Sequence, residues 1–255
     1  MEIDDRRTPE ADVGAQIAAG RDATVHDAGP GLVLRRSPRL VDHRAEAELM
    51  EHLRGAGYPV PRVERIGPGE MVLERIEGPT MLEDLVAHPW RIDRHARTLA
   101  DLHNRLHAIS PPPGLPVHGV WAAHPPDEPA GSVLHQDLHP GNVICSPTGP
   151  VVIDWPNARR GPAEADVALT WILVGAFAME EAPPERGLAR LVQRVEGAAT
   201  PWIRRRLVTT FVRATGLEAE ARACLAATAE VRLADRGTRP AEVPAIHALV
   251  AREAR

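Results

Sequence analysis

The sequence changes character close to position 77, and this change limits the folds that its 255 residues can adopt. Residues 13–36 contain three short apolar segments separated by Gly and Pro, and Met71–Glu74 is a fourth, which favours β-strands. Between them, Ala45–Leu53 has the spacing of a helix. Helical patterns dominate the rest of the chain. We therefore expect an α+β protein with two lobes, an antiparallel sheet lobe at residues 1–77 and a larger helical lobe at residues 78–255.

The second part begins with a break and a helix start. Gly78–Pro79 interrupts the chain, and Thr80 can cap the helix that follows. The strongest helical pattern spans residues 93–108, where one stripe of the predicted helix is apolar. That stripe consists of Ala96, Leu99, Leu102 and Leu106.

Further along, Val143–Cys145 and Val151–Ile153 read as two short strands around a turn. Residues 164–255 are helical almost throughout, with interruptions marked by Pro or Gly. These interruptions are expected near Pro183–Pro184, Thr200–Pro201, Gly216 and Pro240. The most apolar run, Val167–Met179, is shorter than the ~20 residues of a membrane span, so it predicts a core helix and no membrane partner.

Charge and composition exclude other classes of protein. The net charge is −5 and no long basic run occurs, which argues against nucleic acid as a partner. A polar, acidic N-terminus does not resemble a signal peptide, and the two cysteines lie far apart, as expected for a cytoplasmic protein with reduced thiols. The chain contains no lysine, so any site that needs a cation must use Arg. The oligomeric state is left open.

The chemistry concentrates in His135–Asn142 and in the Asp154–Trp155 pair that follows an apolar strand. Phosphoryl transfer needs a carboxylate to orient the attacking hydroxyl, and oxygen ligands for Mg²⁺ beside the phosphates. Asp137 supplies the carboxylate. Asn142, five positions later, and Asp154 supply oxygens, and Pro140–Gly141 can turn the loop so that these side chains face one site.

His-x-Asp-x4-Asn followed by Ile-Asp-Trp resembles the aminoglycoside phosphotransferase family, a branch of the protein-kinase-like fold. The resemblance covers most of the chain in order, and its motifs are specific in combination. The other segments that carry it are Gly20–Val25, Val33–Arg35, Glu46, Tyr58–Pro61, Leu73–Gly78 and Asp166.

The resemblance implies a role for each matching position. Asp137 would be the catalytic base, and Asn142 and Asp154 would bind Mg²⁺. Arg35 would contact the phosphates of ATP and would be held by an ion pair with Glu46. The remaining implied positions are Glu74 and Ile76, in the segment that would contact adenine, and Asp166, which would hold the loop backbone.

The sequence departs from the family pattern at several points. The phosphate-binding cation is Arg35 rather than a lysine, and strand alternation puts Arg36 on the opposite face. Gln136 stands where the family often has Gly, and no G-x-G-x-x-G occurs near Gly20. None of these departures removes a catalytic group.

Two other functions compete with a kinase. A metal-dependent hydrolase could use His135, Asp137 and His139 as zinc ligands, and a nucleotide-binding pseudokinase would bind ATP without turnover. We expect His135 to be structural, whereas His139 could equally face the γ-phosphate. His103 and His107 are expected on a partly buried helix face.

The acceptor of the phosphate is expected to be a small molecule, either an aminoglycoside-like antibiotic or a metabolite. The Pro-rich residues 110–131 and residues 155–185 would line its site. Glu180, Glu181 and Glu185 could contact a cationic acceptor, although they could also be solvated helix ends.

Overall fold

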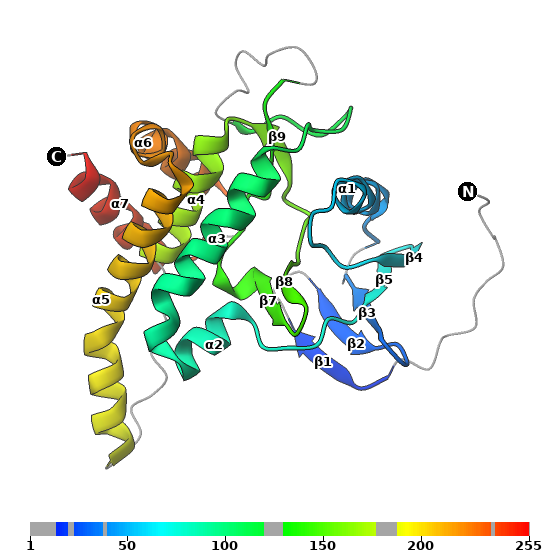
Figure 1. Ribbon diagram of the computed structural model, residues 1–255, viewed down its shortest axis with the longest axis horizontal. Helices are drawn as coiled ribbons and strands as arrows, with labels where there is room; N and C mark the ends of the chain where they lie inside the picture. The colour runs from blue at the N-terminus through cyan, green and yellow to red at the C-terminus, as the bar shows by residue number, and fades with distance from the viewer. Residues whose placement is uncertain are drawn as a thin grey trace. The chain divides into compact units, whose positions relative to one another are not determined.

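The computed structural model describes residues 14–19, 23–37, 40–119, 130–176, 188–235 and 238–254 (Figure 1). The chain divides into two compact units, Met1–Glu77 and Gly78–Arg255. Among the helices of the described ranges, none is long and apolar enough to cross a membrane.

The first unit is an antiparallel sheet with one helix. The strand order is β1-β2-β3-β5-β4, and every neighbouring pair runs antiparallel. Helix α1, Arg44–Gly55, buries Leu49, Met50 and Leu53. The strands are β1 Gln16–Ala19, β2 Thr24–Asp27, β3 Leu32–Arg36, β4 Val63–Gly67 and β5 Glu70–Glu74. The sheet confirms the strands that the sequence predicts and adds β4.

The sequence does not predict strand β4, because β4 lies at the edge of the sheet. Its neighbouring residues Glu64 and Arg65 are both exposed, and the pairing with β5 shifts register between Val63 and Arg65. An edge strand with charged side chains and an irregular register shows no apolar alternation.

The second unit is mainly helical. Its helices are α2 Met81–Ala87, α3 Ile92–His107, α4 Ala163–Gly175, α5 Leu188–Thr215, α6 Glu218–Ala234 and α7 Glu242–Glu253. Its strands form two pairs, β6 Ser132–Leu134 with β9 Arg159–Gly161, and β7 Val143–Ser146 with β8 Gly149–Val152. Short 3₁₀ turns occur at η1, Pro89–Arg91, and η3, Pro140–Asn142.

Helix α3 forms the centre of this core. The four residues of its predicted apolar stripe are all completely buried. It packs along α5, where Arg206 donates two hydrogen bonds to Asp93, at 2.8 and 2.7 Å, and α4 packs along α6 (Figure 1). Residues 167–172 of the predicted apolar run are buried in α4, as expected of a core helix, and residues 177–179 of the run lie outside the described residues.

The break expected at Thr200–Pro201 is wrong, because α5 continues through it to Thr215. A proline inside a helix removes one backbone hydrogen bond. The half of α5 that follows buries Leu207, Val208 and Phe211 in the core, and this packing favours one continuous helix. The break at Gly216 is present, with φ +76° between α5 and α6. The break at Pro183–Pro184 lies outside the described residues.

Helix α2 is fixed at both ends, and it packs against η3 and β7. At its start, Thr80 forms the predicted cap, completed by Glu83 as a reciprocal capping box. Further along, the carboxylate of Asp84 accepts hydrogen bonds from His95 at 2.6 Å, Arg91 at 2.7 Å and His88 at 2.9 Å. One carboxylate therefore holds α2, η1 and α3 together.

This cluster predicts a loss of stability in acid. The hydrogen bond from His95, helped by Arg91, lowers the pKa of Asp84 to about 2, although desolvation opposes the shift. A carboxylate with a depressed pKa stabilises the fold above its unfolded pKa, and this contribution disappears as pH falls through the folded pKa. The difference in Tm between wild type and Asp84→Asn should therefore be largest near neutral pH and shrink between pH 3.8 and about 2.

Thermal melts across this pH range test the prediction. Asp101→Asn serves as the control, because Asp101 lies on α3 with its side chain 65% exposed. Its effect on Tm should be small at every pH. A Tm difference for Asp84→Asn that does not change with pH would contradict the assignment.

Candidate active site

The loop that carries Asp137 lies between β6 and η3, so both of its ends belong to regular structure. The η3 turn begins with Pro140, and the side chain of His139 caps it by accepting a hydrogen bond from the Gly141 amide at 3.0 Å. Asn142 ends the turn, and its backbone N–H donates to the His139 carbonyl at 2.8 Å. The Pro-Gly sequence therefore forms the turn that the sequence predicts.

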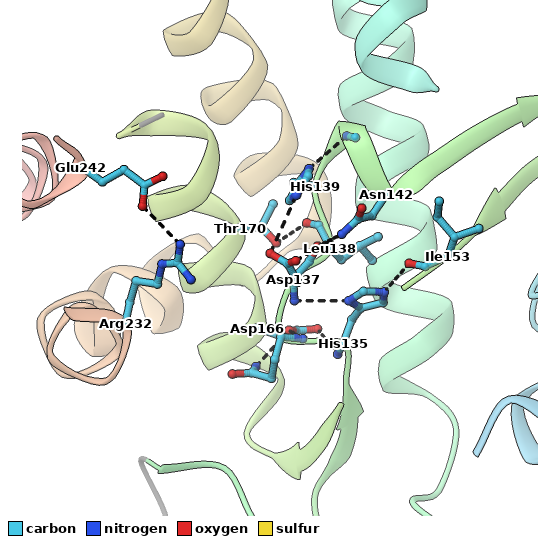
Figure 2. A network of polar contacts seen from close by, with 12 residues as sticks. His135, Asp137, Leu138, His139, Asn142, Ile153, Asp166, Thr170, Arg232 and Glu242 are labelled. Atoms are coloured by element: carbon cyan, nitrogen blue, oxygen red, sulfur yellow. Dashed lines mark hydrogen bonds and ion pairs between the residues drawn. The ribbon is translucent and has the colours of Figure 1, made fainter. Parts of the chain in front are cut away.

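His135 is a structural residue and is completely buried (Figure 2). Its Nε2 donates to the carbonyl of Ile153 at 3.0 Å, and its Nδ1 accepts from the amide of Asp137 at 3.2 Å. A carbonyl can only accept and an amide N–H can only donate, so both ring nitrogens are occupied. His135 thus connects the backbone of Asp137 to the strand end that carries Asp154.

The Asp137 carboxylate remains accessible while its backbone is fixed. Its side chain is 26% exposed. The side-chain Nδ2 of Asn142 donates to the backbone carbonyl of Asp137 at 2.9 Å and lies 3.3 Å from Asp137 Oδ2. His139 Nε2 lies 3.8 Å from Oδ1, and burial lowers the pKa of His139 although Asp137 opposes this. A carboxylate held this way can accept a proton from an incoming hydroxyl.

Asn142 and Asp154 offer oxygens that suit a hard cation. Asn142 uses its side-chain Nδ2 on Asp137, and within the described residues its Oδ1 accepts no hydrogen bond, so Oδ1 remains available to a ligand. Asp154 is exposed and follows Ile153, whose amide donates to the Asn142 carbonyl at 3.0 Å. Amide and carboxylate oxygens are the ligands that Mg²⁺ prefers, so the residues fit this ion.

A zinc site fits less well. Within the described ranges, no group of three or more His, Cys, Asp or Glu residues is placed to hold a metal ion. His135 would have to break two hydrogen bonds to become a ligand, and the Nδ1 of His139 is engaged by Gly141. Of the three residues in the hydrolase hypothesis, His135 is therefore the one that cannot bind a metal ion without losing its structural contacts.

Asp166 of α4 holds the loop from below (Figure 2). Its carboxylate is 1% exposed and accepts from the amides of His135 and Gln136, at 3.1 and 2.9 Å, and from His107 Nε2 at 3.0 Å. Burial alone would raise the pKa of Asp166, but these hydrogen bonds and the nearby histidines hold it well below its ordinary value. Asp166 is structural, as expected, and His107 is a partner that the sequence did not identify.

Two residues of the site adopt left-handed backbone conformations, Gln136 with φ +64° and Asp154 with φ +71°. This conformation costs a residue other than Gly about 1–2 kcal/mol, which explains why Gly suits position 136. Here the Gln136 side chain adds a hydrogen bond to Asp166 at 3.0 Å, which offsets part of the strain. Asp tolerates the conformation better than most residues.

The first unit contains the predicted cation pair. Arg35 of β3 donates from Nη1 to Glu46 Oε1 of α1 at 2.7 Å and makes a second contact through Nη2 and Oε2. Both side chains are largely buried, and Arg35 also donates to His43 at 3.2 Å. Arg36 points to the other face, where it pairs with Glu70 at 2.7 Å and is half exposed. The ion pair expected between Arg35 and Glu46 is thus confirmed.

The two positions expected near adenine differ in their backbone contacts. The Glu74 amide donates to the Arg62 carbonyl at 2.9 Å, and its carboxylate accepts from the Arg62 amide at 3.1 Å. Ile76 lies after β5, and its backbone makes no hydrogen bond to another described residue. Ile76 therefore keeps backbone groups that a ligand can use.

Some predicted binding segments cannot be placed. Residues 20–22 of the expected nucleotide loop, residues 120–129 of the Pro-rich loop, and Glu180, Glu181 and Glu185 all lie outside the described residues.

Comparisons with known proteins agree with the predicted fold. The model of a phosphotransferase enzyme family matches residues 14–119 and 115–207, which is more than half of the chain. No curated protein sequence matches the chain. Several solved structures do, at low sequence identity.

One is the ternary complex of APH(2″)-IIa with streptomycin and ATP, at 13% identity and a TM-score of 0.56, covering 86% of this chain and 84% of that one. A second is the aminoglycoside phosphotransferase APH(4)-Ia, at 14% identity and a TM-score of 0.53, covering 94% and 93%. A third is a thermostable APH(4)-Ia mutant with AMP-PNP and hygromycin B, at 16% identity and a TM-score of 0.51, covering 88% and 94%. These similarities show the protein-kinase-like fold that the sequence predicts.

Proposed function

Because this chain belongs to the phosphotransferase enzyme family, we propose that it transfers the γ-phosphate of ATP to a hydroxyl group of a small molecule. The proposal rests on Asp137, which combines a fixed backbone with an accessible carboxylate. Its backbone is fixed by His135 and Asn142, yet its carboxylate remains partly exposed. A preorganised and accessible carboxylate is what the orientation of an attacking hydroxyl requires.

In the proposed reaction, one oxygen of Asp137 accepts a hydrogen bond from the acceptor hydroxyl and takes its proton as the new O–P bond forms. The bond between the γ-phosphorus and the β,γ-bridging oxygen breaks in the same transfer, and ADP leaves. The Asn142 amide, 3.3 Å from Oδ2, restrains the rotation of the carboxylate. The strand end at Ile153, which His135 holds, keeps Asp154 in register with this loop.

Asn142 Oδ1 and Asp154 would hold Mg²⁺. The ion, when bound, neutralises negative charge on the phosphate oxygens. Asp154 is exposed, which leaves its carboxylate accessible to an ion.

In the first unit, Arg35 would contact the nucleotide phosphates, and Glu46 would hold its guanidinium in place. The fork geometry of Arg suits phosphate oxygens. Ile76 would offer backbone groups to adenine. The complexes of structurally similar proteins with ATP and AMP-PNP support the choice of nucleotide.

The acceptor is proposed to be an aminoglycoside-like antibiotic or another hydroxylated metabolite. Streptomycin and hygromycin B in the complexes of similar structures support the first choice. A screen for ATP consumption with aminoglycosides, macrolides, sugars and amino alcohols tests the proposal, with Mg²⁺ omitted as the control. Products are identified by mass spectrometry. Nucleotide binding without turnover on any acceptor would favour the pseudokinase, and zinc in stoichiometric amount would revive the hydrolase.

A further inference from the structure

We propose that Thr170 of α4 is a positioning residue for the proposed phosphotransfer, acting on the catalytic loop through the carbonyl of Leu138. Thr170 is 1% exposed, and its hydroxyl donates to the Leu138 carbonyl at 2.7 Å (Figure 2). Leu138 directly follows Asp137 and is itself 1% exposed. The contact joins a rigid helix to the residue next to the proposed base.

Thr170 lies on the same face of α4 as Asp166, which also holds the catalytic loop. Thr170 lies four residues after Asp166, so both side chains project from the same face of α4. Asp166 holds the amides of His135 and Gln136, before Asp137, and Thr170 holds the carbonyl after it. A single helix thus fixes the backbone on both sides of Asp137.

The remaining contacts of Asp137 come mainly from inside the motif, since its amide donates to His135 and its carbonyl accepts from Asn142. Without the Thr170 hydroxyl, the peptide unit between Leu138 and His139 could rotate. Such a rotation would move the η3 turn and, with it, the Asn142 amide that restrains the Asp137 carboxylate.

A buried histidine shares the Thr170 hydroxyl. His103 of α3 is completely buried, with Nε2 at 3.0 Å from Thr170 Oγ1 and Nδ1 at 2.8 Å from the Leu99 carbonyl. The carbonyls of Leu99 and Leu138 can only accept, so all three contacts are hydrogen bonds only when both nitrogens of His103 carry protons. Burial lowers the pKa of His103 to about 4, partly opposed by Asp166, so the ring carries one proton at neutral pH.

It follows that the single proton of Thr170 goes to Leu138 when the His103 proton is on Nε2. When the His103 proton is on Nδ1, the ring competes with Leu138 for the Thr170 proton. The 2.7 Å contact from Thr170 to the Leu138 carbonyl, which can only accept, connects the helical core to the loop, and this is the property to test.

The test compares three variants. Thr170→Val removes the hydroxyl and keeps the shape, whereas Thr170→Ser keeps the hydroxyl. Thr215→Val is the matched control, because Thr215 is also buried and donates to a carbonyl at 2.7 Å, that of Val212 in α5, away from the catalytic loop. With an acceptor from the screen, Thr170→Val should lower kcat by ~10-fold and leave the KM for ATP nearly unchanged, because the loop is displaced rather than the nucleotide site.

Thr170→Ser should restore most of kcat, and Thr215→Val should lose stability without losing kcat. If Thr170→Val and Thr215→Val both lose stability and both keep kcat, the role of Thr170 is only structural and the proposal fails.

Hydrogen exchange supplies a readout that does not depend on the proposed function. The backbone amides of residues 136–139, 141 and 142 in the full chain should exchange faster in Thr170→Val than in wild type, and no faster in Thr215→Val; Pro140 has no amide hydrogen. Unchanged exchange in Thr170→Val would overturn the positioning role. If no acceptor consumes ATP but exchange rises as expected, the proposed function fails while the positioning of the loop by Thr170 stands.

Discussion

Asp137→Asn is expected to lower kcat by ~10²–10⁴-fold, the usual range for loss of a general base. The amide cannot take the proton of the acceptor hydroxyl, whereas its size matches that of the carboxylate. The backbone contacts of position 137 with His135 and Asn142 do not involve the carboxylate, so the loop should keep its shape. Affinity for ATP, measured by calorimetry, should remain close to that of wild type.

Asp101→Asn is a suitable control for this experiment, because it also neutralises one carboxylate of the second unit, on an exposed face of α3. It should leave kcat unchanged. If Asp137→Asn retained most of its activity, another group would have to serve as the base, and the proposed role of Asp137 would be wrong.

Asp154→Gly is expected to abolish Mg²⁺-dependent nucleotide binding and turnover while leaving the fold intact. The variant removes the carboxylate, and Gly adopts φ +71° without the strain of an L-residue, so its Tm should equal or exceed that of wild type. Titration of ADP at several Mg²⁺ concentrations measures the first effect and thermal melting the second.

Asp154→Ala completes the comparison. It should lose Mg²⁺-dependent binding equally and should also be less stable than Asp154→Gly, because Ala is strained in this conformation. Retention of Mg²⁺-dependent binding by either variant would exclude Asp154 as a ligand of the ion.

Local patterns were sufficient to predict much of the fold. The apolar stripe of α3 and the cap at Thr80 depend on residues that are close in sequence, and both are present. β4 depends on pairing at a sheet edge, and the continuity of α5 through Pro201 depends on packing further along the helix. Tertiary contacts of this kind leave no periodic signal in the segment itself.

In the candidate site, too, some residues can be identified from the sequence and others only from the fold. Asp137, Asn142 and Asp154 stand out because their spacing is unusual and their chemistry is coherent, and their roles remain predictions. Thr170 and His107 contact the loop or its anchor from distant helices. A threonine in an apolar helix and a histidine in an amphipathic one look ordinary in a sequence, so only the fold identifies them.

The guanidinium paired with Glu46 has a practical consequence for detecting this protein. ATP analogues that acylate an amine depend on a lysine beside the phosphates, but this chain has no lysine, and the cation proposed to contact the phosphates is Arg35. A guanidinium stays protonated and has no lone pair available to attack the reagent. Profiling of kinases with amine-directed nucleotide reagents would therefore miss this protein even where it binds ATP, and reversible binding assays are the means to find it.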